Sequence, residues 1–337
     1  MPISTITIPT TTIFRCIALI AFAFMCMRVG TRSQLDVDDT LAMAPDDMVE
    51  QTHSLCYNEQ TRPPPTRSLV LMVHSGKTGK DYAQEWSNLH YFMRHGVDVS
   101  LADYIFIIPD PAVEAWPEHF VNVTLLDKRP VIRFISLGHA VPCDLCAHAV
   151  VLRTIVGLES ITREYSMVVT MNSGVRGPFP ARRNHWLAYM RQHTFEKTPR
   201  MAVGLAISWE LQCHVQSYFL AIPSCVAPAI ADLWWKTCAV KSMWDCTLVG
   251  ELTDLRFLNS LGVSVYSTSQ NITISSFSDS VAHTPSKVSW WARDYPNPNT
   301  LPINSTMAMF IKFGGGVYRE GWIPSSVFRD MQRREYD

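Results

Sequence analysis

Short runs of apolar and β-branched residues alternate along this chain with segments that repeat apolar residues at helical spacing. The runs predict strands at Ser68–His74, Tyr104–Pro109, Val131–Leu137, Tyr165–Met171 and Ala202–Ser208. The helical spacing predicts helices at Lys80–Arg94, Asp144–Leu158, Pro223–Trp235 and Leu248–Leu261. Such alternation is typical of an α/β domain with a mostly parallel sheet. In the first helix, the apolar face consists of Tyr82, Trp86, Leu89 and Met93.

An uninterrupted apolar run of 12 residues, Cys16–Met27, lies near the N-terminus between Arg15 and Arg28. This length is typical of the core of a signal peptide, and it becomes a short membrane anchor if Arg15 extends to the lipid surface. We interpret residues 1–30 as an uncleaved type II signal anchor. A cleaved signal peptide and a mitochondrial presequence are the alternatives.

Residues 31–66 are predicted to form a disordered acidic stem, because they lack apolar periodicity and end in Pro63-Pro64-Pro65. The folded luminal domain is then expected to comprise residues 67–337 and to begin near Ser68. The whole chain has 337 residues, of which 47% are hydrophobic, and this is enough for a sizeable core.

Sequons and cysteines agree with secretion. The sequons predict glycosylation at Asn122, Asn271 and Asn304. An oxidising lumen favours disulfides, and an odd number of cysteines leaves at least one thiol over. Seven cysteines follow the apolar run: Cys56, Cys143, Cys146, Cys213, Cys225, Cys238 and Cys246. The net charge of −1 gives no electrostatic case for binding nucleic acid.

The segment Tyr165–Pro180 carries the most information about chemistry. A buried-looking strand ends there at Asn172 and Ser173, and Gly177-Pro178 forces a second turn after Arg176. Ligands of open α/β sheets bind at the carboxyl ends of strands. An amide, a hydroxyl and a guanidinium at such an end suit a ligand with a diphosphate and sugar hydroxyls. A polar loop after a core strand is the alternative.

A cysteine pattern and a glycine-rich segment each have a functional and a simpler interpretation. Cys143 and Cys146 form a C-x-x-C pattern at a helix start, with His139 and His148 nearby. A redox dithiol, a zinc site and a structural thiol pair or disulfide are the three interpretations, and a secretory setting favours the last. The segment Gly76–Lys80 lacks the glycine spacing of a phosphate loop, so we expect a solvated turn.

Two further places carry titratable groups. Cys213 and His214 are adjacent on an extended segment and point to opposite faces, so they cannot pair as nucleophile and base, whereas His214 and Gln216 share a face. Glu251 is predicted to begin a helix whose first turn also holds Asp254. It acts there either as a helix-dipole acid or as a general base.

The run from Met171 to Pro180 resembles the L-N-S-S-V-R-G-P-F motif of an uncharacterised eukaryotic family of proposed Golgi glycosyltransferases, which is related to polysaccharide-synthesis enzymes. Other segments resemble motifs of the same family in the same order. They are Asn88–Gly96, Val203–Ile207 with Cys213–Ser217, Glu251 and Phe310–Gly314.

The resemblance implies a GT-A-like, Rossmann-type nucleotide-sugar domain on a type II Golgi membrane protein that faces the lumen; a secreted protein is the alternative. It also implies a divalent cation, Mn²⁺ or Mg²⁺, at the donor diphosphate. In such folds an acidic motif usually holds the cation, and here Asn172 and Ser173 stand in that place. The family pattern N-x-x-x-D-L-C-A is kept at Asp144–Ala147, but Ala140 replaces its asparagine.

The expected function is therefore transfer of a sugar from a nucleotide-sugar donor to a glycan or polysaccharide acceptor in the Golgi lumen. The candidate catalytic residues are Asp144, on donor hydroxyls, and Glu251, as the base of an inverting reaction. The candidate donor-binding residues are Asn172, Ser173, Arg176, Gly177, His214 and Gln216. A catalytically inactive carbohydrate-binding or scaffold protein of the same fold is the alternative, and a thiol oxidoreductase that uses Cys143 and Cys146 is a weaker one.

Overall fold

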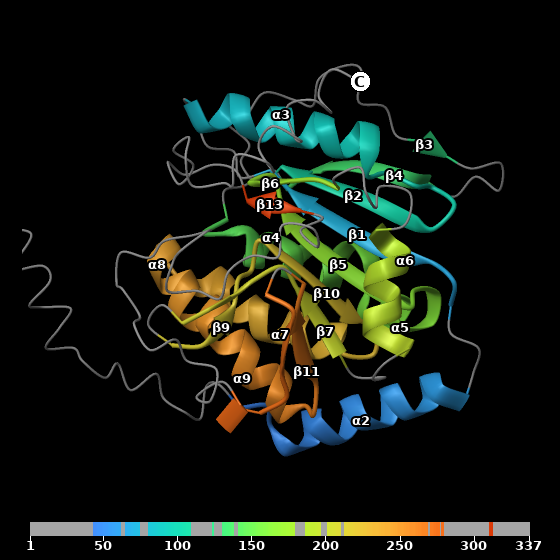
Figure 1. Cartoon of the computed structure of the whole chain (residues 1–337), viewed down its shortest axis with the longest axis vertical. Coiled ribbons are helices and arrows are strands. Elements are labelled where there is room, and N and C mark those ends of the chain that lie inside the picture. The colour runs from blue at the N-terminus through green and yellow to red at the C-terminus, as the bar shows by residue number, and fades with distance from the viewer. Residues whose placement is uncertain are drawn as a thin grey trace, which may run out of the picture. The chain divides into compact units, whose positions relative to one another are not determined.

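A mixed sheet of nine strands forms the centre of the domain (Figure 1). The structure is a computed structural model, and it describes residues 43–61, 65–74, 80–108, 123–124, 130–137, 141–178, 186–196, 201–209, 212–268, 270–276, 278–279 and 310–312. The sheet order is β12-β11-β7-β10-β5-β1-β2-β4-β3. The strands are β1 (Ser68–Val73), β2 (Ala102–Ile108), β3 (Val123–Thr124), β4 (Pro130–Ser136), β5 (Met167–Asn172), β7 (Met201–Gly204), β10 (Phe219–Pro223), β11 (Ser264–Ser267) and β12 (Ile272–Ile274).

Most neighbouring strands at the centre of the sheet run parallel. β1 pairs in parallel with β2 and β5, β2 with β4, and β7 with β11. β10 runs antiparallel between β5 and β7, and β3 and β12 run antiparallel at the two edges. This confirms an α/β domain with a mostly parallel sheet.

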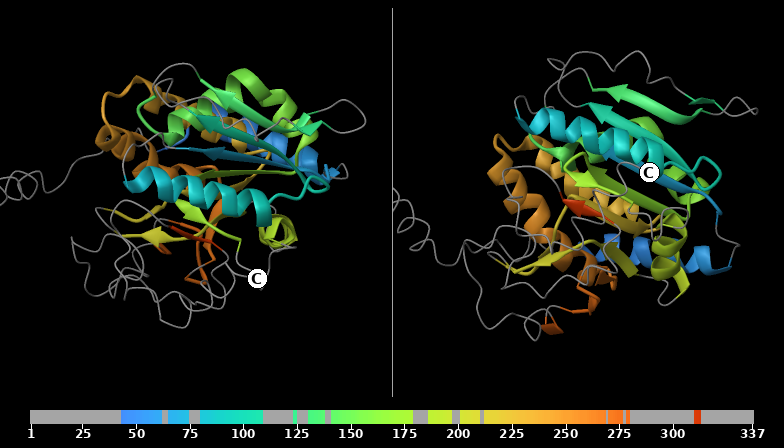
Figure 2. Two further views of the ribbon diagram at one scale, coloured as in Figure 1. Left: turned by 90° about the horizontal axis from the view of Figure 1, so that it is seen from above. Right: turned by 45° about the horizontal axis from the view of Figure 1, so that its top comes forward.

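Helices cover both faces of the sheet (Figure 2). Alternate residues of β1 point to opposite faces, so Leu69 and Leu71 join one apolar core while Val70 and Met72 join the other. The first core packs under α2 (Asp46–Thr61), α4 (Asp144–Val150), α5 (Leu158–Glu164), α7 (Ala227–Trp235) and α9 (Leu252–Ser260). The second core packs under α3 (Lys80–His95) and α6 (Trp186–Arg191).

Smaller elements complete the described chain. Two short two-stranded sheets pair β6 (Val175–Arg176) with β13 (Ile311–Lys312), and β8 (Ile207–Ser208) with β9 (His214–Val215). The remaining helical pieces are α8 (Met243–Cys246), a 3-10 turn (Lys236–Ala239) and π-helical turns at Val151–Val156, Gln192–Glu196 and Thr247–Glu251. The predicted strand Ala202–Ser208 is thus divided between β7 and β8, which belong to different sheets.

Two predicted helices have different limits in the structure. The predicted helix Asp144–Leu158 ends at Val156, because Gly157 has a φ of 84° that suits glycine, and α5 then begins at Leu158 at an angle of 80° to it. The segment Pro223–Trp235 begins too early, because Pro223 ends β10 and α7 starts at Ala227. In both places a local turn interrupts an apolar run that sequence periodicity alone reads as continuous.

The buried face of α3 differs from the predicted one. Glu85, Asn88, Leu89 and Phe92 are almost fully buried, at helical spacing of three and four residues. Trp86 and Met93 of the predicted face are only partly buried. Polar side chains therefore contribute to the buried face. Apolar periodicity in the sequence does not detect these residues.

The predicted disordered stem is wrong for residues 46–61, because they form α2. Thr52 and Cys56 of this helix are buried, and Cys56 forms a disulfide with Cys225 at the start of α7. The backbone N–H of Ala44 also donates to the hydroxyl of Ser260 at the end of α9, over 2.9 Å. The folded domain thus begins well before Ser68.

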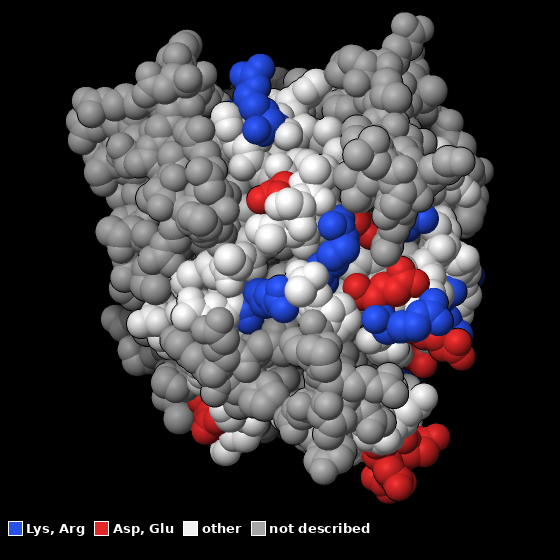
Figure 3. Space-filling model, turned by 90° about the vertical axis from the view of Figure 1, so that its right-hand side faces the viewer, with Lys and Arg blue, Asp and Glu red and all other residues white. Residues whose placement is uncertain are grey.

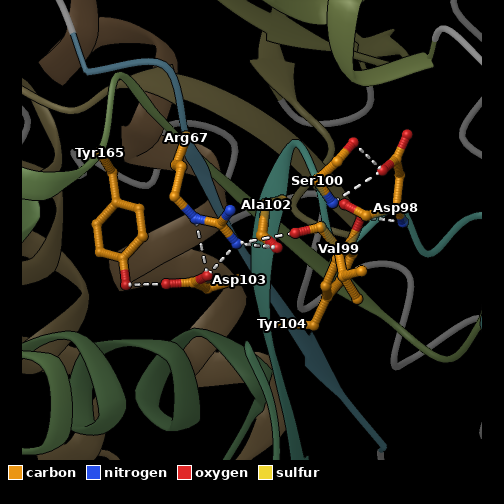
Figure 4. A network of polar contacts seen from close by, with 8 residues as sticks. All are labelled: Arg67, Asp98, Val99, Ser100, Ala102, Asp103, Tyr104 and Tyr165. Carbon is orange, nitrogen blue, oxygen red and sulfur yellow. Dashed lines mark hydrogen bonds and ion pairs between the residues drawn. The ribbon is translucent and has the colours of Figure 1, made fainter. Parts of the chain in front are cut away.

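A buried polar network ties together the amino ends of β1, β2 and β5 (Figure 4). The Arg67 guanidinium makes an ion pair with Asp103 and donates to the carbonyl oxygens of Val99 and Ala102 at 3.1 and 2.8 Å. The Tyr165 hydroxyl donates to the other carboxylate oxygen of Asp103 over 2.8 Å. This network fixes the amino ends of these three strands relative to one another.

Several expectations fall on residues outside the described part, namely the apolar run Cys16–Met27, Ala140 and the sequons at Asn122 and Asn304. Asn271 is described; it is exposed, and its side-chain oxygen accepts from the Tyr266 hydroxyl at 2.9 Å. Among the described helices, none by itself has the length and apolar character to span a membrane; only the bent pair Asp144–Val156 and Leu158–Glu164, taken together, meets that criterion.

Candidate functional site

The order of strands places a topological switch point between β1 and β5. From β1 the chain builds outward through β2 to β4, and it then returns to add β5 on the other side of β1. Ligands of open α/β sheets bind in the crevice beyond the carboxyl ends of the strands at such a point. In this protein, Val73 of β1 and Asn172 of β5 lie in register at that end.

The structure brings Asn172 and Asp144 together. Asn172 is the last residue of β5 and Asp144 is the first residue of α4. The Asn172 amide donates to Oδ2 of Asp144 over 2.7 Å, and its own oxygen accepts from the Gly174 backbone N–H at 3.0 Å. Both side chains are partly buried. A carboxylate and an amide thus lie side by side at the strand end.

Ser173 points to the opposite face of the sheet, toward α3. Its hydroxyl donates to Oε2 of Glu85 over 2.8 Å. Its carbonyl oxygen accepts from the Asn88 amide at 2.9 Å, and its backbone N–H donates to the Val73 carbonyl oxygen at 2.8 Å. Ser173 is fully buried. Consecutive residues of an extended chain alternate between faces, so Asn172 and Ser173 reach different layers of the domain.

Arg176 also binds α3. Its guanidinium donates to the Ser87 hydroxyl over 3.1 Å and lies 4.6 Å from the centre of the Tyr91 ring, within cation–π range. Only 8% of the residue is exposed. Burial lowers the pKa of Arg176, and Tyr91 opposes this shift. Gly177 follows with a φ of 151°, and the Gly177-Pro178 peptide is cis.

His214 and Gln216 lie at the short β8–β9 sheet. A ring nitrogen of His214, Nδ1, is 2.8 Å from the Gln212 carbonyl oxygen, and His214 is buried. The Gln216 backbone N–H donates to Ala206, while its side-chain oxygen is buried without a hydrogen-bond partner among the described residues. Within the same residues, no hydrogen bond joins His214 or Gln216 to Asn172 or Asp144.

The sequence predicts that Glu251 begins a helix, but in the structure Glu251 lies inside a longer helical run. A continuous helical run starts at Met243, and Glu251 ends its π-helical turn just before α9. The N-terminal dipole of that run therefore lies at α8. An oxygen of Glu251 accepts from the Ser217 backbone N–H at 2.9 Å, and Tyr218, the next residue, accepts from the backbone N–H of Asn172. Glu251 thus lies near the end of β5.

A buried pair of titratable residues lies beneath these carboxylates. Asp254 and His148 are fully buried, and both face Trp234. The Trp234 indole donates to Oδ1 of Asp254 over 2.9 Å, and its ring centre is 6.0 Å from that of His148. Among the described residues, Oδ2 of Asp254 and both ring nitrogens of His148 have no hydrogen-bond partner.

Burial dominates the titration of both residues. It lowers the pKa of His148 to about 4, against the opposing charge of Asp144. It raises the pKa of Asp254 well above its usual value, and the charges of Glu251 and Asp144 raise it further, while the hydrogen bond from Trp234 lowers it. These interactions place Asp144, Glu251 and Asp254 in one electrostatic neighbourhood.

Sequence reasoning missed Glu85 and His74, which lie beside Ser173. Glu85 is 4% exposed, and its Oε2 lies 3.9 Å from Nδ1 of His74, the residue after β1. Burial lowers the pKa of His74, and the charge of Glu85 opposes this. The signal in the sequence was the spacing of Glu85 with Asn88, Leu89 and Phe92 on one helix face.

Both cysteines of the C-x-x-C pattern form disulfides, in agreement with the structural role that the sequence favours. Cys143 is bonded to Cys246 and Cys146 to Cys238, so the two do not pair with each other. Both are buried. Cys213 takes part in none of the three disulfides. The two disulfides fasten the start of α4 to α8 and to the turn after α7. Asp144 lies between the two bonded cysteines, so its backbone is fixed as well.

The described part of the chain offers no cluster of metal ligands, and the face in Figure 3 shows no concentration of charge. No group of three or more His, Cys, Asp or Glu residues is placed there to hold a metal ion. On the face drawn in Figure 3, the described basic side chains are interspersed with acidic ones, and neither sign predominates. The strand ends around Asn172 therefore remain the candidate site.

Comparison with known proteins assigns no family. The chain matches no protein-family model, and it matches no curated protein at a significant level.

Proposed function

We propose that this chain is a glycosyltransferase that takes a nucleotide-sugar donor and passes the sugar to a glycan acceptor. The observation that carries the proposal is the Asp144–Asn172 pair at the carboxyl end of β5, beside the switch point of the sheet. The α/β fold is compatible with the GT-A-like domain that the sequence resemblance implies. A type II anchor in the Golgi membrane and luminal orientation belong to the same proposal.

Asp144 and Asn172 offer complementary groups to the donor. A carboxylate accepts hydrogen bonds from ribose or sugar hydroxyls, and an amide both donates and accepts. Each already uses one atom on the other, which fixes the direction of their remaining hydrogen-bonding positions. Preorganised groups of this kind bind a polar ligand at less entropic cost.

Ser173 and Arg176 play a different part in this proposal from the one expected. Their side chains are engaged with α3 and are buried. We assign them to the shape of the turn after β5. The backbone of that turn then faces the diphosphate, with Mn²⁺ or Mg²⁺ as the counter-ion supplied with the donor. His214 and Gln216 are left as candidates for the acceptor side of the site.

Glu251 is the proposed general base. One of its oxygens is held by the Ser217 backbone N–H, and this orients the carboxylate near the strand end. In an inverting transfer, the base takes the proton of the acceptor hydroxyl as that oxygen attacks the anomeric carbon and the nucleoside diphosphate leaves. Asp254, one helical turn further on, is too deeply buried to touch a substrate.

The test is a donor panel. Purified protein is titrated with UDP-, GDP- and CMP-linked sugars, with and without Mn²⁺, and binding is followed by thermal shift and calorimetry. One donor should bind clearly better than the others, and Asp144→Ala should weaken it, while Asp232→Ala, an exposed control on α7, should not. A protein that binds none of them is not a nucleotide-sugar transferase.

The second candidate function is a non-catalytic carbohydrate-binding or scaffold protein of the same fold. The neutral pair Asn172 and Ser173, in the place where an acidic metal motif is expected, favours it. The two functions differ in turnover. Binding of a glycan without hydrolysis or transfer of any donor sugar would select this second candidate.

A further inference from the structure

Side chains of helix α3 bind the segment that follows β5. Ser173 is bonded through three of its groups: its hydroxyl to Glu85, its carbonyl oxygen to Asn88 and its backbone N–H to Val73. Three residues further on, Arg176 is bonded to Ser87 and lies over Tyr91. The turn between β5 and β6 is thus fixed on the α3 face of the sheet, although the candidate ligand-binding pair lies on the other face.

Glu85 links the two strands that border the switch point. Its carboxylate accepts from Ser173, which follows β5, and lies 3.9 Å from Nδ1 of His74, which follows β1. All three residues are 4% exposed or less. A hydrogen bond to a charged acceptor is stronger than one between neutral groups, and burial strengthens it further. Glu85 therefore has the position to hold the end of β5 beside the end of β1.

The orientation of Asn172 depends on this attachment. Asn172 and Ser173 share one planar peptide, and their side chains point to opposite faces. When Ser173 is fixed at three points, only small rotations remain for Asn172, whose amide must meet Asp144 at 2.7 Å. Loss of the Glu85 contact would leave only the two backbone contacts of Ser173 and would loosen the turn that sets the Asn172 amide against Asp144.

We propose that Glu85 is a positioning residue of the site: by accepting from Ser173 beside His74, it fixes the exit of β5 and thereby orients the Asn172–Asp144 pair. Glu85 itself touches no ligand, because Ser173 and the sheet lie between it and that pair. The inference rests on the proposed function only for its binding measurement, since the geometry of the turn can be followed without a ligand.

The experiment compares the full chain with Glu85→Ala, Glu85→Gln, Ser173→Ala and the double Glu85→Ala/Ser173→Ala variant. Glu85→Gln keeps the shape and an acceptor oxygen, and it serves as the conservative variant if Glu85→Ala fails to fold. Glu159→Gln, on the exposed face of α5, is the matched control. Hydrogen exchange is measured by mass spectrometry in peptides that cover residues 167–178 and, for comparison, β2. Donor affinity is measured by calorimetry.

In Glu85→Ala and Ser173→Ala, the amides of residues 172–176 should exchange about tenfold faster, while β2 keeps its protection. Donor affinity should fall about tenfold in each, and the double variant should be no worse than either single one, because both remove the same contact. Glu85→Gln should restore most of the protection, and the Glu159→Gln control should match the wild type.

Unchanged exchange in residues 172–176 of Glu85→Ala or Ser173→Ala would overturn the proposal. So would equal loss of protection in β2, because a general loss of stability is not positioning. If the wild-type chain binds no nucleotide sugar, the proposed function fails, but the exchange measurement still decides whether Glu85 fixes this turn.

Discussion

The side-chain amide of Asn172 donates to Oδ2 of Asp144 over 2.7 Å and so joins the last residue of β5 to the first residue of α4. In the chain, the two residues are separated by the rest of α4, a π-helical turn, α5 and the rest of β5. Asp144 follows β4, and the parallel strands β4, β2, β1 and β5 all end at the same edge of the sheet, which brings the two residues together. This contact places a carboxylate where α/β sheets bind their ligands.

Asp144→Ala should weaken binding of the best nucleotide-sugar donor at least tenfold, because it removes an acceptor for the ligand and the partner of Asn172. Calorimetry measures the change. Asp232→Ala, which removes an exposed carboxylate from α7, is the control and should bind as the wild type does. Equal affinity of Asp144→Ala and wild type would remove Asp144 from the donor site.

Glu251→Gln should lower the transfer rate by roughly 10²- to 10⁴-fold, the usual contribution of a general base, and leave donor affinity almost unchanged. The amide oxygen of glutamine can still accept from the Ser217 backbone N–H, so the local structure should persist. Steady-state transfer assays and calorimetry separate the two effects. A variant with full transfer activity would show that Glu251 is not the base.

A chain that begins at residue 66 should be less stable than one that begins at residue 43. The shorter chain lacks α2 and its disulfide between Cys56 and Cys225, which closes a separation of 169 residues. Loss of a native disulfide typically costs about 2–5 kcal/mol. Urea unfolding of both chains, with a Cys56→Ser/Cys225→Ser variant of the longer one, measures the two contributions. Equal midpoints in all three would show that α2 does not stabilise the domain.

Arg67→Ala should lower the free energy of unfolding by about 3–5 kcal/mol, because it leaves the buried Asp103 carboxylate without its cation. Arg153→Ala breaks the ion pair with Asp232, in which both side chains are more than a third exposed, and should cost less than about 1 kcal/mol. Denaturant unfolding of the two variants is compared. A similar cost in both would mean that the network at Arg67 is effectively solvated.

His148 should make the domain less stable at mildly acidic pH. Its pKa is lowered to about 4 in the folded state from 6.5, so the unfolded chain binds the proton first as pH falls. Stability from this residue is unaffected above pH 6.5 and is lost between pH 6.5 and about 4. The loss from pH 7 to pH 5 should be about 2 kcal/mol.

His148→Phe keeps a flat aromatic ring and cannot titrate, so it should remove most of this acid-induced loss. Urea unfolding at pH 7 and pH 5 is measured for both proteins. Asp254 acts in the opposite direction. Its pKa is raised in the folded state, so the folded state loses stability as the pH increases above the usual pKa of an aspartate. An identical pH dependence in wild type and His148→Phe would contradict the assignment.

The alternation of short apolar runs and helical periodicity was sufficient to predict the α/β class. β1, β4 and β5 lie close to their predicted positions, because a strand buried on both faces needs continuous apolar residues. The end of β5 at Asn172 and the start of a helix at Asp144 could also be inferred from residue type and spacing. These are local properties of the chain.

The tertiary structure decided everything that depends on contacts between distant segments. Sequence did not indicate that α2 packs on the domain, because its acidic surface hides only a few buried residues such as Cys56. It could not pair Cys143 with Cys246 or Cys146 with Cys238, since connectivity depends on which helices become neighbours. The sequence also predicted a helix start at Glu251, whereas the helix begins about two turns earlier, at Met243.

The two sides of β5 show the limit most clearly. Composition identified Asn172 and Ser173 as one polar group at a strand end, and that much the sequence by itself determined. Only the sheet order and the packing of α3 and α4 decided that Asn172 meets Asp144 and that Ser173 meets Glu85. The physical reason is that successive side chains of a strand point to opposite faces of the sheet. The residues that they contact there come from remote parts of the chain.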